Sequence, residues 1–167
     1  MVLLLRKKVI AFFSFLMISF NICAQSPAET IPEFKFFKLN KSSFTNKDLE
    51  PNKFLFFCFF DISCDHCQHA IEKISQHYSE FNRTAIYLIT LDNQEGIKNF
   101  LNKHGQNLPG KRNVTILQDL QYEFINKFKP KKYPSMFLYS QNKRLMLYDD
   151  NEENVFKFLK LINLSAK

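Results

Sequence analysis

Residues 54–74 read FLFFCFFDISCDHCQHAIEKI, and this stretch decides how the rest of the chain is interpreted. Its first part, residues 54–60, is continuously apolar, which is typical of a strand buried on both faces in a parallel sheet. From Ala70 to Phe81 apolar residues recur at helical spacing, which predicts a helix of about four turns. Cys64 and Cys67 therefore stand where a buried strand ends and a helix begins.

The N-terminus has the form of a secretory signal peptide over residues 1–24, with basic residues, then an apolar run, then small Ala24 before the cleavage point. One alternative is a retained membrane anchor, although a run of about a dozen apolar residues is shorter than the roughly 20 that span a bilayer. The other is lipid attachment at Cys23, which the large Ile22 before it fits poorly. We expect an exported, periplasmic protein with a linker over residues 25–33 and one domain over residues 34–167, since 167 residues suffice for one core.

Charge and cysteine content limit the partners. Cleavage lowers the formal net charge from +7 to +4, because residues 1–24 hold three basic residues and no acidic one. The remaining basic residues are dispersed or mixed with acids, so we expect no nucleic-acid partner. Only Lys127–Lys132 is locally dense, and it is either a solvated loop or a segment that attracts acidic partners. Three cysteines remain after cleavage, most simply one pair and one buried thiol, Cys58.

Strand and helix patterns alternate after the cysteine turn and end in a hairpin and a helix. This order predicts an α/β domain with a mixed sheet, helices on both sides and right-handed first crossovers. Asp119 is placed to cap a helix, and Asp150 or Asn151 another. The expected strands, or turns for the first two, are residues 34–40 and 43–49 at the edge, then 54–60, 85–91, 113–117, 135–140 and 144–148. Three later helices are expected from their apolar residues: the first carries Ile97, Phe100 and Leu101 before Gly105, the second Leu120, Phe124, Ile125 and Phe128, and the third Val155, Phe158, Leu159 and Ile162.

The spacing of Cys64 and Cys67 favours redox chemistry. Unpaired N–H groups and the dipole at a helix N-terminus stabilise an anion, so they favour the thiolate at Cys64 and make it the nucleophile. Cys67, one turn further in, can resolve a mixed disulfide. Between them, a protonated His66 would stabilise the thiolate, whereas Asp65 would oppose it, and the sequence leaves the net sign open.

Other roles for this cysteine pair fit less well. A structural zinc site needs four ligands, and no second cysteine pair exists, although His69 or His77 could contribute. Covalent haem requires histidine directly after the second cysteine, where Gln68 stands. A structural disulfide across so short a loop would gain little entropy. We therefore expect no metal and no organic cofactor.

With these elements in place, the chain resembles the thioredoxin superfamily, and within it the extracytoplasmic TlpA/ResA-like thiol-disulfide oxidoreductases. The resemblance runs from about Pro32 to Leu164. Residues 32–60 look like that group's N-terminal extension and first core strand, residues 85–105 like its second core strand and extra helical insertion, and YPSMFLYSQNKRLML (133–147) like its cis-proline strand and hairpin. The resemblance implies a thioredoxin fold with this extension and insertion.

The resemblance also implies further site residues. It places Pro134 opposite the cysteine turn in a cis bond, with Tyr133 as the residue that faces the substrate. It exposes two departures as well. The buried acid that many thioredoxins carry six residues before the first cysteine is replaced by Cys58, and the glutamate that some ResA-like reductases use is replaced by Ala70. We expect Cys58 to fill the core, with exchange between Cys58 and Cys67 as the alternative.

The resulting hypothesis is a monomeric thiol-disulfide oxidoreductase. It exchanges a dithiol for a disulfide with exported protein substrates, in the reducing direction, and a membrane or periplasmic redox donor recycles it. One alternative is a thiol peroxidase, which wants a hydroxyl side chain three residues before the reactive cysteine, where Asp61 stands. Another is a copper-binding module that uses both cysteines and a histidine.

Overall fold

The computed structural model describes residues 26–165, and the predicted signal peptide and Cys23 lie outside this range. Seven strands form one mixed sheet in the order β2-β1-β5-β4-β3-β6-β7. The parallel strands β3, β4 and β5 lie at its centre, and the others join antiparallel. The strands are β1 (Lys35–Lys38), β2 (Ser43–Thr45), β3 (Phe54–Phe59), β4 (Thr84–Thr90), β5 (Val114–Gln118), β6 (Ser135–Tyr139) and β7 (Leu145–Asp149).

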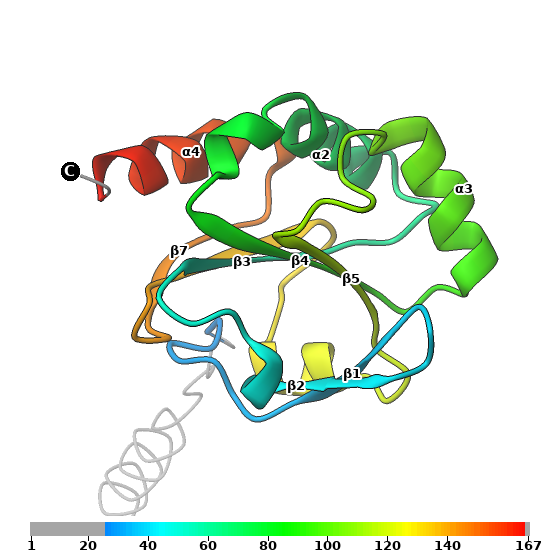
Figure 1. Ribbon diagram of the computed structural model, residues 1–167, viewed down its shortest axis with the longest axis horizontal. Coiled ribbons are helices and arrows are strands. Elements are labelled where there is room, and N and C mark those ends of the chain that lie inside the picture. The colour runs from blue at the N-terminus through cyan, green and yellow to red at the C-terminus, as the bar shows by residue number, and fades with distance from the viewer. Residues whose placement is uncertain (1–25, 166–167) are drawn as a thin grey trace, which may run out of the picture.

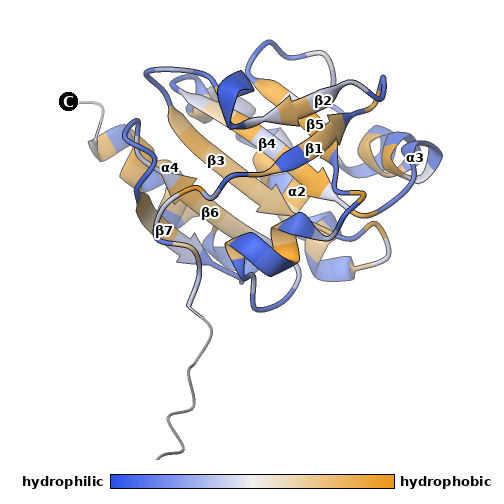
Figure 2. Cartoon of the chain, turned by 90° about the horizontal axis from the view of Figure 1, so that it is seen from below, coloured by the Kyte–Doolittle hydropathy of each residue, from blue (hydrophilic) through white to orange (hydrophobic). Residues whose placement is uncertain are grey.

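The central strand β3 is buried along its whole length, as its apolar sequence predicts. Successive side chains of a strand point to opposite faces. Phe56 and Cys58 accordingly belong to the core cluster under the helices, together with Cys67. Phe57 and Phe59 belong to a second, largely aromatic cluster on the other face. Figure 2 shows the apolar strands at the centre of the molecule.

The three α-helices of residues 26–165 lie on one face of the sheet (Figure 1): α2 (Asp65–Gln76), α3 (Gln94–His104) and α4 (Val155–Leu164). The chain moves from β3 to β4 to β5 in one direction across the sheet, so two crossovers of the same hand place α2 and α3 on the same side. The prediction of helices on both sides was therefore only partly right. The other face is covered by the short turns η1 (Asn46–Asp48) and η3 (Phe124–Phe128) and by aromatic side chains.

Two predicted helices differ from the observed ones. The helix after the cysteine turn ends at Gln76 and is followed by a separate 3-10 turn, η2 (Tyr78–Phe81), so the prediction of one helix as far as Phe81 was wrong. By contrast, α3 ends at Gly105 as predicted. The closing helix is preceded by the 3-10 turn η4 (Glu152–Asn154), which the side chain of Asn151 caps by accepting from the N–H of Glu153.

Asp119 was predicted to cap a helix; it binds the start of η3, a single π-helical turn, but the residue at the N-cap position is Glu123. The buried Asp119 carboxylate accepts hydrogen bonds from the backbone N–H groups of Gln121, Glu123 and Phe124, at 3.2, 3.0 and 2.7 Å. Leu120 was expected on the buried side of this helix, but 57% of it is exposed, because the turn begins only after it. The cap thus fixes the segment that leads toward Pro134.

Part of the predicted linker packs on the domain. The N–H of Ala28 donates to the carbonyl of Phe128 at 3.0 Å, and the carbonyl of Glu29 accepts from Leu145 at 2.7 Å. Ile31 is buried in the aromatic cluster. These contacts attach residues 28–31 to η3 and β7.

Candidate active site

Cys64 is the N-cap residue of α2, at the end of the turn that leaves β3. Its carbonyl accepts hydrogen bonds from the N–H groups of Cys67 and Gln68, at 3.0 and 3.1 Å, which starts the helix. The Cys64 side chain makes no capping hydrogen bond at this helix end. The half-buried sulfur of Cys64 therefore sits where free N–H groups and the helix dipole favour a negative charge.

Cys67 lies behind Cys64 and is completely buried. Burial raises the pKa of the Cys67 thiol, and although the N–H of Asp61 donates to its sulfur at 3.5 Å, the nearby Cys58 and a hydrogen bond with Cys64 raise it further. Cys67 is therefore a neutral thiol at physiological pH. Of the two, only Cys64 combines access to solvent with a charge-stabilising position, which fits the roles of nucleophile and resolver.

The turn between β3 and Cys64 is fixed by two carboxylates. Asp61 accepts from the N–H and the hydroxyl of Ser63, at 2.7 and 2.6 Å. Asp92 follows the neighbouring strand β4 and accepts from the N–H of Ile62 at 3.1 Å, while the hydroxyl of Thr90 donates to the same carboxylate at 2.6 Å. These bonds set the approach of the chain to Cys64 before any substrate binds.

His66 contacts a carboxylate from a distant part of the chain. Its Nδ1 lies 2.7 Å from Oε1 of Glu152 in η4. Burial would raise the pKa of Glu152, but the hydrogen bond with His66, with smaller help from Lys73, lowers it overall. Asp65 stays exposed and accepts a 3.4 Å bond from Gln68. Glu152 is thus placed to compensate a positive charge on His66, the charge that would stabilise the Cys64 thiolate.

We predict that Glu152→Gln makes the Cys64–Cys67 disulfide more oxidising. Without the carboxylate, a protonated His66 has no compensating charge and stabilises the Cys64 thiolate, and thus the reduced form. The reduction potential should rise by roughly 10–30 mV. Equilibration with glutathione measures this.

The matched control is Glu152→Gln in a His66→Gln background. There the change at residue 152 should leave the potential almost unchanged. An equal shift in both backgrounds would show that Glu152 acts independently of His66.

Tyr133 and Pro134 lie beside the cysteine turn, and the bond between them is cis, as the resemblance implies. The Tyr133 ring packs on the ring of Phe59, with centroids 4.8 Å apart. Burial, together with the negative charges of Asp61 and Asp92, raises the pKa of Tyr133 to about 12, so its hydroxyl stays neutral. Within residues 26–165 the backbone N–H and carbonyl of Tyr133 bond to no other backbone group, which leaves both open to an extended peptide.

Tyr148 holds the loop before Pro134 in place. Its hydroxyl accepts from the N–H of Lys131 at 3.0 Å, donates to Asp150 at 3.2 Å and lies 3.0 Å from the hydroxyl of Ser135. The hydroxyl of Ser135 donates to the carbonyl of Lys132 at 2.7 Å. The hairpin of β6 and β7 thus holds the loop that contains Tyr133 in place.

At the two positions where acids are missing, the structure has a buried thiol and a buried methyl group. Cys58 is fully buried, and burial raises the pKa of its thiol to about 12, so it is no base at neutral pH. Ala70 is also fully buried, in the same helix as Cys67. Cys58 belongs to the same core cluster as Cys67, and Ala70 follows Cys67 by three residues in α2. Deprotonation of Cys67 must therefore use a group other than these.

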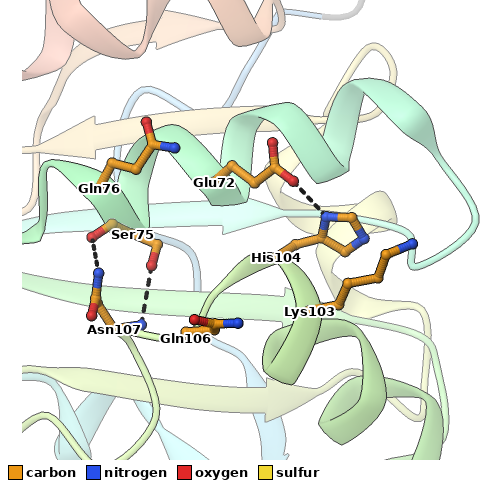
Figure 3. A pocket seen from close by; sticks show the side chains of 7 residues that line it. All are labelled: Glu72, Ser75, Gln76, Lys103, His104, Gln106 and Asn107. Carbon is orange, nitrogen blue, oxygen red and sulfur yellow. Dashed lines mark hydrogen bonds and ion pairs between the residues drawn. The ribbon is translucent and has the colours of Figure 1, made fainter.

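A polar cavity of about 230 Å³ lies between the far half of α2 and the end of α3 (Figure 3), and hydrogen bonds across it join the two segments. Glu72 of α2 lies 2.7 Å from Nδ1 of His104 at the end of α3. Further along, the hydroxyl of Ser75 accepts from the N–H of Asn107 at 3.1 Å. These contacts hold the helix that carries Cys67 in a fixed position on the sheet.

Comparison with known proteins agrees with this geometry. The model of the AhpC/TSA family matches residues 27–148, most of the chain. The chain belongs to the AhpC/TSA family. No curated protein sequence matches the chain as a relative.

Solved structures of the same fold come from several bacteria. The chain is 19% identical to a thiol-disulfide oxidoreductase from Bacteroides fragilis, covering 79% of this chain and 98% of that one with a TM-score of 0.65. It is 15% identical to a secreted Mycobacterium tuberculosis disulfide oxidoreductase homologous to E. coli DsbE, covering 77% and 95% with a TM-score of 0.62. A putative thioredoxin from Neisseria meningitidis is 18% identical, covering 82% and 89% with a TM-score of 0.66. The thioredoxin fold is thereby confirmed, and family and fold together identify a thioredoxin-like oxidoreductase.

All six predicted site residues lie at one end of the sheet, but their partners were missed. Asp92 could have been found, because it follows a buried parallel strand next to β3, and the carboxyl ends of such strands meet at one edge. Glu152 and Tyr148 gave no such signal, since they reach the site only through the hairpin and η4.

Proposed function

We propose that the protein is an exported thiol-disulfide oxidoreductase that reduces disulfides of protein substrates. The observation that carries this proposal is the arrangement of a half-exposed Cys64 at a helix N-terminus, a buried Cys67 behind it and the open backbone of Tyr133 beside it. An extended substrate segment that pairs with the Tyr133 backbone would lie against Cys64. Bacterial relatives with the same fold include a protein described as secreted, which supports export.

The exchange runs in two steps. The Cys64 thiolate attacks one sulfur of a substrate disulfide, and the other substrate sulfur leaves as a thiolate and takes up a proton. Cys67 then loses its proton and attacks Cys64 in the mixed disulfide, which releases the second substrate thiol and leaves a Cys64–Cys67 disulfide. Two electrons have passed to the substrate. A membrane or periplasmic dithiol donor of the same chemistry restores the pair by the reverse exchange.

The charges around Cys64 support the reducing direction. The contact with Glu152 at 2.7 Å compensates His66, and Asp65 adds a negative charge at the start of α2. A thiolate is less stable in this surrounding than beside an uncompensated histidine, which makes the reduced protein a better electron donor. The pair therefore suits a reductase better than a strong oxidant.

Two alternatives receive less support. Asp61, at the position where peroxidase chemistry wants a hydroxyl, is already engaged by Ser63. For copper, no three histidine, cysteine or acidic side chains converge anywhere in residues 26–165. Also within that range, no helix is long and apolar enough to cross a bilayer.

Equilibration of the protein in a series of glutathione buffers tests the proposal. We expect one two-electron transition, followed by intact mass, with a potential closer to about −270 mV, as in thioredoxin, than to about −120 mV, as in a strong oxidant. Cys58→Ser should retain the transition. A transition that survives in Cys67→Ser would exclude the Cys64–Cys67 pair, and a potential near −120 mV would overturn the reducing direction.

A further inference from the structure

A small groove is lined in part by Tyr133, the residue beside the cysteine turn. It has a volume of about 180 Å³ and is lined by Phe59, Ile125, Pro130, Lys131, Lys132 and Tyr133, and we refer to it as the lysine groove. Its apolar part is formed by the buried ring of Phe59, the ring of Tyr133 and the partly exposed side chain of Ile125. The groove is therefore reached by any peptide that lies along Tyr133.

Ile125, which lines this groove, belongs to a short stretch of the chain with exposed apolar side chains. Among residues 26–165, three of the five large apolar side chains that are exposed lie within one stretch of six residues: Leu120, Tyr122 and Ile125, at 57, 59 and 38%. Clustered exposed apolar side chains mark a binding surface more often than scattered ones do. This stretch precedes the lysine groove directly in the chain.

The rim of the groove is positively charged. Residues 124–134 contain four lysines and no acidic residue. In the described part of the chain, neither Lys129 nor Lys131 pairs with a carboxylate, and Lys132 lies 3.7 Å from Asp150 with most of its side chain exposed. The ammonium group of Lys131 is instead positioned over the Tyr148 ring, 5.7 Å from its centre. Lys127 is paired with Glu123 at 3.1 Å, so an acidic residue of a partner would meet Lys131 without a carboxylate and Lys132 with only a long contact to Asp150.

Negative charges also lie near Tyr133. Asp61 and Asp92 lie close enough to the Tyr133 hydroxyl to raise its pKa, and Asp65 begins α2 next to Cys64. A peptide that crosses Tyr133 therefore passes from a negative to a positive surface. Such an arrangement favours an acidic residue of the segment at the lysine groove.

We propose that the lysine groove binds an apolar side chain of the substrate with an acidic residue beside it, in the segment that carries the disulfide. The inference rests on the proposed function and names the class of substrate: disulfide-bearing proteins whose cysteine is followed or preceded closely by an apolar–acidic pair. The apolar side chain fills the space over Phe59 next to Ile125, and the carboxylate pairs with Lys131 or Lys132.

Binding of non-reactive peptides tests the groove without redox chemistry. Three extended peptides are matched in length and have serine in place of cysteine; at the groove position they carry Leu-Glu, Ser-Glu or Leu-Lys, and fluorescence anisotropy gives their affinities. We expect the protein to bind the Leu-Glu peptide about tenfold more tightly than the Leu-Lys peptide, a difference of roughly 1.4 kcal/mol. Equal affinities for these two peptides would overturn the inference.

Charge reversal gives the decisive comparison. Lys131→Glu/Lys132→Glu should reverse the preference toward the Leu-Lys peptide, and Ile125→Ser should reduce the difference between the Leu-Glu and Ser-Glu peptides. The matched control is Lys98→Glu/Lys160→Glu, which changes the net charge equally at exposed positions of α3 and α4. The same loss of preference in this control would show a general charge effect and contradict a groove.

Reduction of disulfide forms of the three peptides, with a small organic disulfide as reference, separates this inference from the proposed function. The charge-reversed variant should reduce the small disulfide at the wild-type rate and the Leu-Glu peptide more slowly. If no disulfide were reduced while the binding preference held, the proposed function would fail and the groove would stand. Equal kcat/KM values for all three peptides would remove the groove and leave the proposed function intact.

Discussion

Cys64→Ser is expected to lower the rate of insulin reduction by at least about a thousandfold, since it removes the attacking nucleophile. Cys67 cannot substitute for it, because it is completely buried and its pKa is raised by that burial. The assay follows insulin precipitation with dithiothreitol as the electron source, after subtraction of the uncatalysed rate. Serine has nearly the same size, so the fold should be retained.

Cys58→Ser is the matched control for this result. It removes a thiol from the same core cluster without touching the exchange, and it should keep insulin reduction within a few-fold of the wild type. Activity of Cys64→Ser above about a tenth of the wild-type rate would show that another group attacks the substrate.

Cys58→Asp is expected to accelerate resolution of the mixed disulfide by roughly tenfold to a hundredfold, since it supplies a general base for Cys67. Residue 58 lies in the core cluster that contains Cys67, and both cysteines have pKa values raised by burial. The same substitution buries a carboxylate without a partner, so the free energy of unfolding should fall by about 2–4 kcal/mol. The loss in the free energy of unfolding should be larger at pH 8 than at pH 5, because burial raises the pKa of the carboxyl group and the folded state therefore disfavours its charged form.

Cys58→Asn separates the two effects. The amide has the shape of the acid but accepts no proton, so this variant should be destabilised without faster resolution. Single-turnover reduction of a peptide disulfide gives the rates, and urea unfolding gives the stabilities. Equal rates in the Asp and Asn variants would mean that the missing acid does not limit the reaction.

The sequence predicted the fold well where local pattern and burial agree. The run FLFFCFF predicted a doubly buried strand, since only a central parallel strand needs apolar side chains on both faces. Gly105 and Asp119 marked a helix end and a cap by their local chemistry. The helix predicted to reach Phe81 stopped at Gln76, because apolar spacing alone does not distinguish a continued helix from a 3-10 turn that buries the same side chain.

The candidate site was predictable as far as its chemistry is local. Cys64, Cys67 and Pro134 were assigned from a short motif and a resemblance, and the structure brings them to one end of the sheet. The partner of His66 could not be predicted, since Glu152 lies 86 residues away and reaches it through the hairpin and η4. From the sequence, the lysines of residues 127–132 were either a solvated loop or a segment that attracts acidic partners. A binding groove is favoured because Phe59 and Tyr133 line the same cavity as Lys131 and Lys132.

Trapping of a mixed disulfide on Cys67→Ser tests the central claim most directly. This variant keeps the nucleophile and lacks the resolver, so incubation with oxidised insulin should yield a covalent adduct that survives without reductant and disappears with it. Peptide mapping should locate the insulin chain on Cys64. The absence of an adduct, or an adduct on Cys58, would contradict the assignment of Cys64 as nucleophile and Cys67 as resolver.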